Sequence, residues 1–104
     1  MNSLDTVFSA LSNSARRDIL ARLAHGEAAL SDLAMPFQMT QTAVTKHVRT
    51  LENAGLVELE KRGRTRYCRL STAPMKEAVD WLETYKAFWE ERLDGLAKYV
   101  NENP

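Results

Sequence analysis

The chain has 104 residues, enough for one small domain, and its 14 basic and 14 acidic residues give a formal net charge of zero. A single cysteine, Cys68, excludes an internal disulfide and fits a reducing compartment. No apolar run approaches the roughly 18 residues that a membrane-spanning helix needs, and the N-terminus lacks a signal-peptide pattern. We therefore expect a cytoplasmic protein with no membrane partner, folded as one domain over residues 1–104.

Two helices are predicted before residue 26. Apolar residues at helical spacing indicate a short helix over about residues 4–11, which must pack against another element because it is too short to be stable alone. Asn13 is a good N-cap for a second helix from Ser14 to His25, and Gly26 supplies its stop. The buried stripe of the second helix is predicted to be Ile19, Leu20 and Leu23.

A helix-turn-helix is predicted between residues 30 and 54. Residues 30–35 indicate a positioning helix of one to two turns that stops around Pro36. After a short connection, Thr40 can cap and Gly55 can end a second helix, whose buried stripe is Val44, Val48 and Leu51. Its opposite face carries amide, hydroxyl and cationic groups, which read base edges and bind phosphates when a helix lies in the major groove of DNA. The candidate DNA contacts of this recognition helix are Gln41, Thr42, Thr45, Lys46, His47 and Arg49.

The same periodicity would suit an ordinary surface helix with a solvated polar face. The segments that follow favour the recognition helix, because residues 56–60 and 65–70 alternate apolar and polar side chains as half-exposed strands do. Gly63 between them permits a tight hairpin turn. We expect this hairpin to be a wing that lies along the phosphate backbone, with Lys61, Arg62, Arg64 and Arg66 as its contacts.

A charged hairpin can also serve only to keep a sheet edge from pairing. The distribution of charge favours DNA instead. Residues 41–70 hold seven basic and three acidic side chains, whereas residues 1–40 hold three and four and residues 71–104 hold four and seven. A positive middle third between negative flanks is typical of a surface that faces nucleic acid beside a surface with another role.

A long amphipathic helix is predicted from about Ser71 or Thr72 to about Val100, with Pro74 in its first turn. Its apolar stripe is too long to be covered by one small domain, so its simplest partner is the same helix of a second copy, joined by the first helix around a two-fold axis. Its polar face is acidic, which argues against a membrane surface. The candidate dimer-interface residues are Leu4, Val7, Phe8, Val79, Leu82, Tyr85, Trp89, Leu93 and Leu96.

Three stretches of the chain resemble the ArsR/SmtB family of bacterial transcriptional repressors. They run from Leu11 to Leu20, from Gln41 to Val57 and from Gly63 to Tyr67. The resemblance implies a mainly α fold with a small β-hairpin, a winged helix-turn-helix in the order helix, helix, helix, helix, strand, strand, helix. It also implies that residues of about 30–70 form the DNA-reading unit and that the first and last helices form the homodimer interface.

Many members of that family sense toxic metals, and this chain lacks the required ligands. In one type of family site two cysteines stand where this chain has Ala29 and Ser31, and the other type needs histidines in the last helix, which has none. The remaining soft or imidazole ligands are His25, His47 and Cys68, which are far apart in the predicted elements. We therefore expect no metal and no cofactor.

Residues 80–93 are similar to a non-metal-sensing branch of the family. The expected function is a sequence-specific, homodimeric repressor that binds an inverted repeat in double-stranded DNA, and a small-molecule or protein effector is left open. The alternative is a winged-helix module that binds another protein and not DNA, which the neutral net charge favours. An enzyme is not expected, because the chain has no Gly-rich phosphate loop, no convergent carboxylate pair and no nucleophile with a base at suitable spacing.

Overall fold

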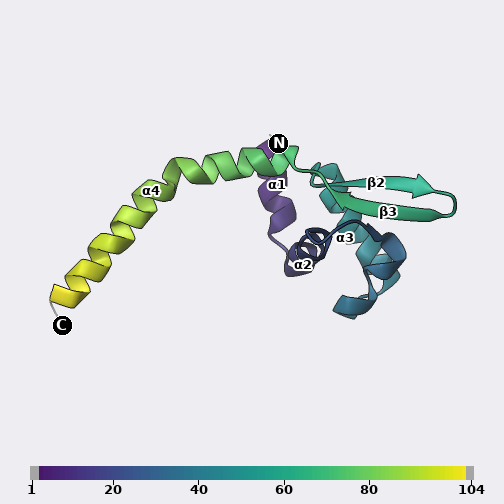
Figure 1. The fold of residues 1–104 in the computed structure, drawn as a ribbon, viewed down its shortest axis with the longest axis horizontal. Coiled ribbons are helices and arrows are strands. Elements are labelled where there is room, and N and C mark those ends of the chain that lie inside the picture. The colour runs from purple at the N-terminus through teal and green to yellow at the C-terminus, as the bar shows by residue number, and fades with distance from the viewer. Residues whose placement is uncertain (1–2, 103–104) are drawn as a thin grey trace.

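The computed structural model describes residues 3–102, so the four terminal residues of the predicted 1–104 domain lie outside it. The three strands form one antiparallel sheet in the order β1-β3-β2. A mainly helical chain with a β-hairpin, as the sequence predicts, is confirmed (Figure 1). In chain order the elements are α1 (Ser3–Leu11), α2 (Ser14–Leu23), β1 (Ala28–Ala29), the 3-10 turns η1 (Leu30–Asp32) and η2 (Met35–Phe37), α3 (Gln41–Asn53), β2 (Val57–Arg62), β3 (Thr65–Leu70) and α4 (Ala73–Glu102).

The hydrophobic core contains residues from α1, α2, α3, the sheet and the first turns of α4, which together form the body of the protein. The predicted α3 stripe of Val44, Val48 and Leu51 is fully buried, as are Ile19 and Leu33. Leu56 and Cys68 pack into the core from the side of the sheet, and Ala78 packs into it from the first turns of α4. Burial of this apolar surface is the main favourable term in folding, and it fixes how α3 lies against the sheet.

Caps define the ends of α3. The Thr40 side chain accepts a hydrogen bond from the backbone N–H of Ala43 at 3.1 Å. At the other end, the N–H of Gly55 donates to the Glu52 carbonyl and the N–H of Leu56 donates to the Leu51 carbonyl, both at 2.9 Å. This pair of bonds is a Schellman motif, and it requires the left-handed φ of 76° that Gly55 adopts. The predicted start and end of the recognition helix are therefore confirmed.

The segment before α3 differs from the prediction. The predicted positioning helix over residues 30–35 is present only as the 3-10 turn η1, followed by a second 3-10 turn, η2, and Pro36 lies inside η2 and does not follow the helix. So short a segment with a proline in it cannot support a run of α-helical hydrogen bonds. The strand β1 was not predicted, since Ala28 and Ala29 have low strand propensity and pair only because β3 presents an edge.

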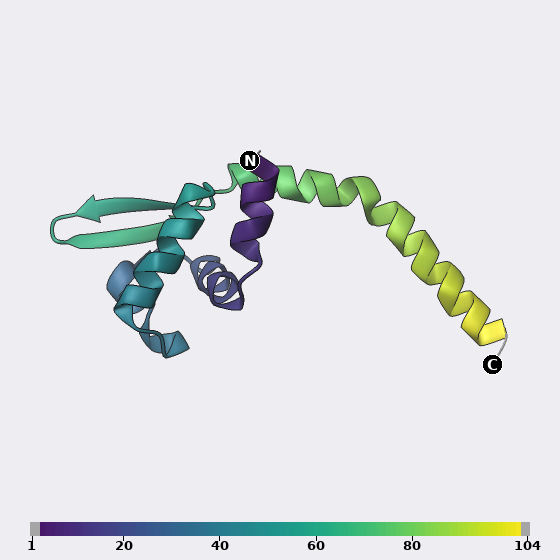
Figure 2. The same cartoon turned by 180° about the vertical axis from the view of Figure 1, so that it is seen from behind.

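The last helix leaves the body and extends away from it as an arm, whereas α1 packs beside its first turns (Figures 1 and 2). The radius of gyration is 18.1 Å, against the roughly 13 Å expected of a compact domain of this length. Thirty residues of helix span about 45 Å, which is most of the longest dimension of 63 Å. Over residues 3–102, no helix has the length and apolar character to span a bilayer.

Candidate nucleic-acid interface

The exposed face of α3 gathers five of the six predicted recognition residues. Gln41, Thr42, Thr45, Lys46 and Arg49 line one shallow hollow on the surface. Their spacing of one, three and four residues places them on a single helical face, opposite the buried stripe. Within residues 3–102, neither Lys46 nor Arg49 has an ion-pair partner, so both positive charges face solvent uncompensated.

Two of these side chains already form hydrogen bonds with the backbone. The amide of Gln41 donates to the Leu30 carbonyl at 3.2 Å, which ties the start of α3 to η1. The Thr45 hydroxyl donates to the Gln41 carbonyl at 2.9 Å. The Gln41 side-chain oxygen and the Thr45 hydroxyl oxygen can still accept hydrogen bonds, whereas Thr42 has both functions of its hydroxyl available.

His47, the sixth predicted recognition residue, lies on the flank of α3. A rotation of about 100° per residue puts its side chain some 160° from that of Arg49. It is half-buried, and its Nδ1 lies 3.5 Å from the Nη1 of Arg16 on α2. The structure therefore does not favour the predicted contact of His47 with DNA, because the side chain turns toward α2 and away from the exposed face.

The two hairpin strands are in register with Lys61 directly opposite Arg66. Both side chains lie on the sheet face toward α3, where they line a hollow together with Arg49, Glu52 and Asn53. Like charges directly opposite each other on neighbouring strands destabilise a hairpin, so this pair does not serve its folding. The two cations extend the positive surface of α3 onto the wing.

Arg64 occupies the second position of the hairpin turn, after Gly63 with its φ of 63°. It borders a hollow shared with Gln41 and Arg66, so the tip of the wing faces the N-terminal end of the recognition helix. Three of the four predicted wing residues, Lys61, Arg64 and Arg66, thus border the same surface as α3. We call the set of Lys46, Arg49, Lys61, Arg64 and Arg66 the cationic surface.

Arg62 does not belong to the cationic surface. Strand alternation puts it on the opposite sheet face, where it pairs with Glu27 at 2.6 and 3.0 Å and with Glu60 at 2.9 Å. Its guanidinium carbon also lies 4.6 Å from the ring centroid of Tyr67. The structure therefore does not favour the predicted wing contact of Arg62, because its guanidinium group lies on the opposite sheet face and is paired with two carboxylates.

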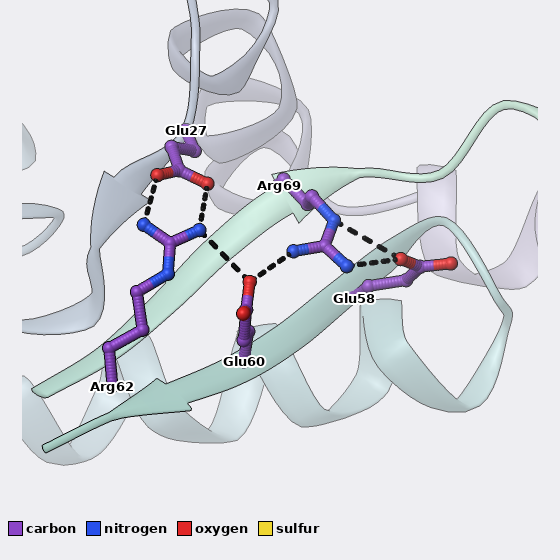
Figure 3. Close-up of polar contacts among 5 residues, drawn as sticks. All are labelled: Glu27, Glu58, Glu60, Arg62 and Arg69. Atoms are coloured by element: carbon purple, nitrogen blue, oxygen red, sulfur yellow. Dashed lines mark hydrogen bonds and ion pairs between the residues drawn. The ribbon is translucent and has the colours of Figure 1, made fainter.

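The pairing continues across the sheet as a network of five side chains (Figure 3). Arg69 binds Glu60 at 2.7 Å and Glu58 at 3.0 Å, so Glu60 bridges the two arginines. The hydrogen bond from Arg62 lowers the pKa of Glu27 and, with that from Arg69, lowers the pKa of Glu60. The network neutralises the two arginines of this sheet face and links β2 and β3 to the residue that precedes β1. Its members are Glu27, Glu58, Glu60, Arg62 and Arg69.

Arg16 and Arg17 hold the end of α1. The Nε of Arg16 donates to the Ala10 carbonyl at 2.7 Å, and the Nη1 of Arg17 donates to the Leu11 carbonyl at 2.8 Å. These carbonyls have no partner inside α1, so the two guanidinium groups satisfy the helix terminus. Both side chains therefore stabilise the fold of the body.

The candidate metal ligands are dispersed. Cys68 is fully buried on β3, and burial raises the pKa of its thiol to about 11, so it is a protonated core residue at neutral pH. His25 lies at the exposed end of α2, and His47 contacts Arg16. Across residues 3–102 no three histidine, cysteine or acidic side chains come together as a candidate metal site.

The residues predicted for the dimer interface fall into two groups. The six on α4 are exposed, from 45% for Val79 and Tyr85 to 61% for Leu93, and Leu4 and Phe8 of α1 are partly exposed beside them. Phe8 contacts Trp81 of α4 edge to face, with ring centroids 5.6 Å apart. Val7 is the exception. It is wholly buried inside the body, so the prediction that it lies in an interface is wrong, since it has no surface left to cover.

Sequence reasoning missed Glu27. A lone glutamate before two alanines gives no local signal, and its partner Arg62 lies 35 residues away in the sequence. The alternation of residues 56–60 and 65–70 could have separated Arg62 from Lys61 and Arg66, because neighbours in a strand face opposite sides of the sheet.

Comparisons with known proteins identify the family. The model of a helix-turn-helix domain matches residues 11–60. The HTH-type transcriptional regulator Rv2034 of Mycobacterium tuberculosis is 31% identical over 99 residues, which are 95% of this chain and 90% of that protein. The transcriptional repressor SdpR of Bacillus subtilis is 27% identical over 79 residues, 76% of this chain and 88% of SdpR.

Solved structures agree with the sequence matches. A crystal structure of an ArsR family transcriptional regulator is 36% identical, superposes with a TM-score of 0.78, and covers 86% of this chain and 98% of its own. The homodimeric winged helix-turn-helix DNA-binding domain of Mb0332 from Mycobacterium bovis, solved by NMR, is 27% identical with a TM-score of 0.65, covering 89% of this chain and 83% of that one. Identity at this level over nearly the whole length shows more than a shared fold, and the protein belongs to the ArsR family of winged helix-turn-helix transcriptional regulators.

Proposed function

We propose that the protein is a homodimeric repressor that binds an inverted repeat in double-stranded DNA. One observation carries the proposal. The five side chains of the cationic surface have no ion-pair partner within residues 3–102, whereas both arginines on the opposite sheet face are paired with glutamates. Charge left uncompensated on one face of a neutral protein suits the binding of phosphates.

We assign different roles to α3 and the hairpin. On α3, Thr42, Lys46 and Arg49 suit contacts with base edges in the major groove, with Gln41 and Thr45 as acceptors at the start of the helix. On the hairpin, Lys61, Arg64 and Arg66 suit the phosphate backbone beside that groove. Phosphate contacts fix orientation and supply affinity, whereas base contacts supply sequence preference.

The exposed apolar stripe of α4 supports the homodimer. Large apolar side chains along a helix that projects from a small body need a partner, and identical subunits most commonly pair around a two-fold axis. The resemblance to the homodimeric domain from Mycobacterium bovis favours the same state here. A dimer would present its two α3 helices to half-sites about 34 Å apart, and the similarity to SdpR, a repressor, favours repression as the outcome.

A fluorescence anisotropy titration on the protein's own upstream region tests this. We expect two chains per duplex, preference over a scrambled duplex of equal length, and an affinity that falls steeply between about 50 and 200 mM salt. Equal affinity for the scrambled duplex would contradict sequence-specific regulation. Binding that does not respond to salt would contradict the role of the cationic surface.

A further inference from the structure

Arg16 of α2 contacts both α1 and α3. Its Nε donates to the Ala10 carbonyl at 2.7 Å and its Nη2 donates to the Ser9 carbonyl at 3.2 Å, both near the C-terminal end of α1. Its Nη1 lies 3.5 Å from the Nδ1 of His47 on α3. A guanidinium group is planar and holds its donors in a fixed fork, so the two bonds to α1 also fix the direction in which Nη1 points. One side chain thus relates the end of α1 to the flank of the recognition helix.

The position of His47 on α3 determines what this contact can do. At about 100° per residue, His47 lies about 60° around the helix from Val44 in the buried stripe. Gln41 lies about 60° from Val44 on the other side, and its amide donates to the Leu30 carbonyl at 3.2 Å. The apolar stripe itself is held by non-directional contacts, whereas polar contacts depend on direction. The two polar contacts on opposite flanks therefore resist a roll of α3 about its own axis.

A small roll of α3 is enough to disrupt contacts with bases. The tips of helical side chains lie roughly 5 to 6 Å from the axis, so a roll of about 10° moves them by roughly 1 Å. Hydrogen-bond lengths vary by only about 0.5 Å, and base edges in the groove do not move to follow a side chain. The cations of the wing lie outside α3, and long flexible side chains still reach a phosphate after such a shift. A roll should therefore weaken base reading more than phosphate binding.

We propose that Arg16 is a positioning residue for DNA recognition. Through His47 it fixes the roll of α3, and it thereby sets the preference of the protein for its own site over other DNA without touching the duplex. This inference rests on the DNA binding proposed above and names a residue that controls its specificity. Arg17 is the matched neighbour, because it is exposed, donates to the Leu11 carbonyl at 2.8 Å, and has no bond to α3 within residues 3–102.

Anisotropy titrations of Arg16→Lys and Arg17→Lys test the proposal. Each variant of the full chain is titrated on a duplex from its own upstream region and on a scrambled duplex, and the ratio of the two dissociation constants is its DNA preference. Lysine keeps the charge of Arg16, but one ammonium nitrogen cannot reach both the end of α1 and His47. We expect Arg16→Lys to reduce the DNA preference by about 2- to 30-fold and Arg17→Lys to leave it unchanged. A wild-type preference in Arg16→Lys, or an equal loss in both variants, would overturn the proposal.

The DNA preference also separates positioning from a loss of fold. If a variant is partly unfolded, only its folded fraction binds, so its apparent affinity for the two duplexes falls by the same factor. The ratio of the two dissociation constants then stays at the wild-type value. Equal losses on both duplexes would give Arg16 a structural role alone and would overturn the positioning role.

A double-mutant cycle tests whether Arg16 acts through His47. We expect His47→Ala to reduce the DNA preference, and the double variant Arg16→Lys/His47→Ala to reduce it no further than the more affected single variant. Two losses that multiply in the double variant would show that the residues act independently, which is contrary to the proposal.

Direct contact of Arg16 with a phosphate is the competing role. It predicts that Arg16→Gln, which removes the charge, lowers the slope of log affinity against log salt by about 1. We expect that slope to stay at the wild-type value while the DNA preference falls, and a lower slope would overturn the proposal. A wild-type protein without any DNA preference would overturn the proposed function as well, whereas a wild-type preference that Arg16→Lys retains would overturn only the role of Arg16.

Discussion

Arg62 and Arg66 are close in sequence and belong to opposite faces of one hairpin. Arg66 lines the hollow shared with Arg49, whereas Arg62 is held by Glu27 and Glu60. The side chains have the same charge, and only strand register and the available carboxylates distinguish them. Their environments make Arg62 a control for Arg66.

Substitution of Arg66 by alanine removes one charge from the cationic surface. We expect Arg66→Ala to weaken binding to specific and scrambled duplexes alike and to reduce the slope of log affinity against log salt by about 1. Arg62→Ala removes an equal charge from the opposite face and should leave that slope unchanged. Anisotropy titrations at several salt concentrations measure both, and an equal change in the two variants would contradict the assignment of faces.

Gly55 combines a left-handed φ with a close neighbour, since Pro74 leaves no room for a side chain. We expect Gly55→Ala to lower the free energy of unfolding by about 1 to 3 kcal/mol because of backbone strain. The contact of the added methyl group with Pro74 should lower it further. Gly63→Ala is a matched control, because Gly63 has φ 63° and an added methyl group there would meet nothing within 4 Å. Urea denaturation compares the two variants, and a larger loss of unfolding free energy for Gly63→Ala would show that Pro74 moves aside at little cost.

At the scale of elements, the sheet is held by side chains as well as by backbone pairing. The strand β1 has two residues, yet Glu27 beside it reaches Arg62 near the end of β2, across β3 (Figure 3). Because β1 leads directly into η1 and the loop before α3, this contact also ties the wing to the segment that positions the recognition helix. The network thereby connects the hairpin, which carries Lys61, Arg64 and Arg66, to the segment that leads into α3, which carries Lys46 and Arg49.

Measurements of folding stability at acid pH test this network. The lowered pKa of Glu27 means that its pairing stabilises the fold fully above the ordinary pKa of 4.5, and that this contribution is lost as pH falls through the lowered value. We expect Glu27→Gln to be less stable than the wild type at pH 7 and to match it once the pH is below the lowered pKa. Urea denaturation at a series of pH values measures the difference.

Asp18→Asn is a control for that series, because Asp18 is exposed on α2 and has no ion-pair partner within residues 3–102. Its stability should follow the wild type at each pH. A constant difference between Glu27→Gln and the wild type down to the most acid pH would show that ionisation of Glu27 is not the cause.

At the scale of the whole molecule, the exposed apolar surface of α4 is the feature that packing within a single chain does not explain. Ten large apolar side chains of α4 are at least 44% exposed, and the radius of gyration reflects a helix that packs against its own body only at its first turns. Exposed apolar surface of this extent favours association, because burying it releases water from both partners.

Trp89 lies in the exposed apolar stripe of α4 that we propose for the dimer interface, and it is 60% exposed in the single chain. Central aromatic residues contribute most to an interface, so we expect Trp89→Ala to weaken the dimer by about 2 kcal/mol or more, roughly 30-fold in dissociation constant. Met35→Ala is the control, since Met35 is 86% exposed on η2, away from α4. Sedimentation over a concentration series measures both, and equal dissociation constants would contradict an interface formed by the apolar stripe of α4.

Local signals in the sequence were sufficient to predict the four α-helices and the hairpin, but not the two 3-10 turns before α3. Asn13, Thr40 and Gly55 mark helix ends because capping depends on neighbouring backbone groups, and the α3 stripe follows from the helical period alone. The exposed face of α3 and the long α4 were predictable for the same reason. The family resemblance agreed with both.

Contacts between distant residues decided the rest. The pairing of β1 with β3, the link from Glu27 to Arg62 and the turn of His47 toward Arg16 join segments that are 31 or more residues apart or that have no strand signal of their own. Burial of Val7 was likewise fixed by packing, since helical spacing cannot say which apolar residue faces the body. The sequence by itself determined which segments are helices and where positive charge is concentrated, because these depend on neighbours along the chain. Only the tertiary structure decided which of the charged side chains remain free to bind, because ion pairs form between neighbours in space.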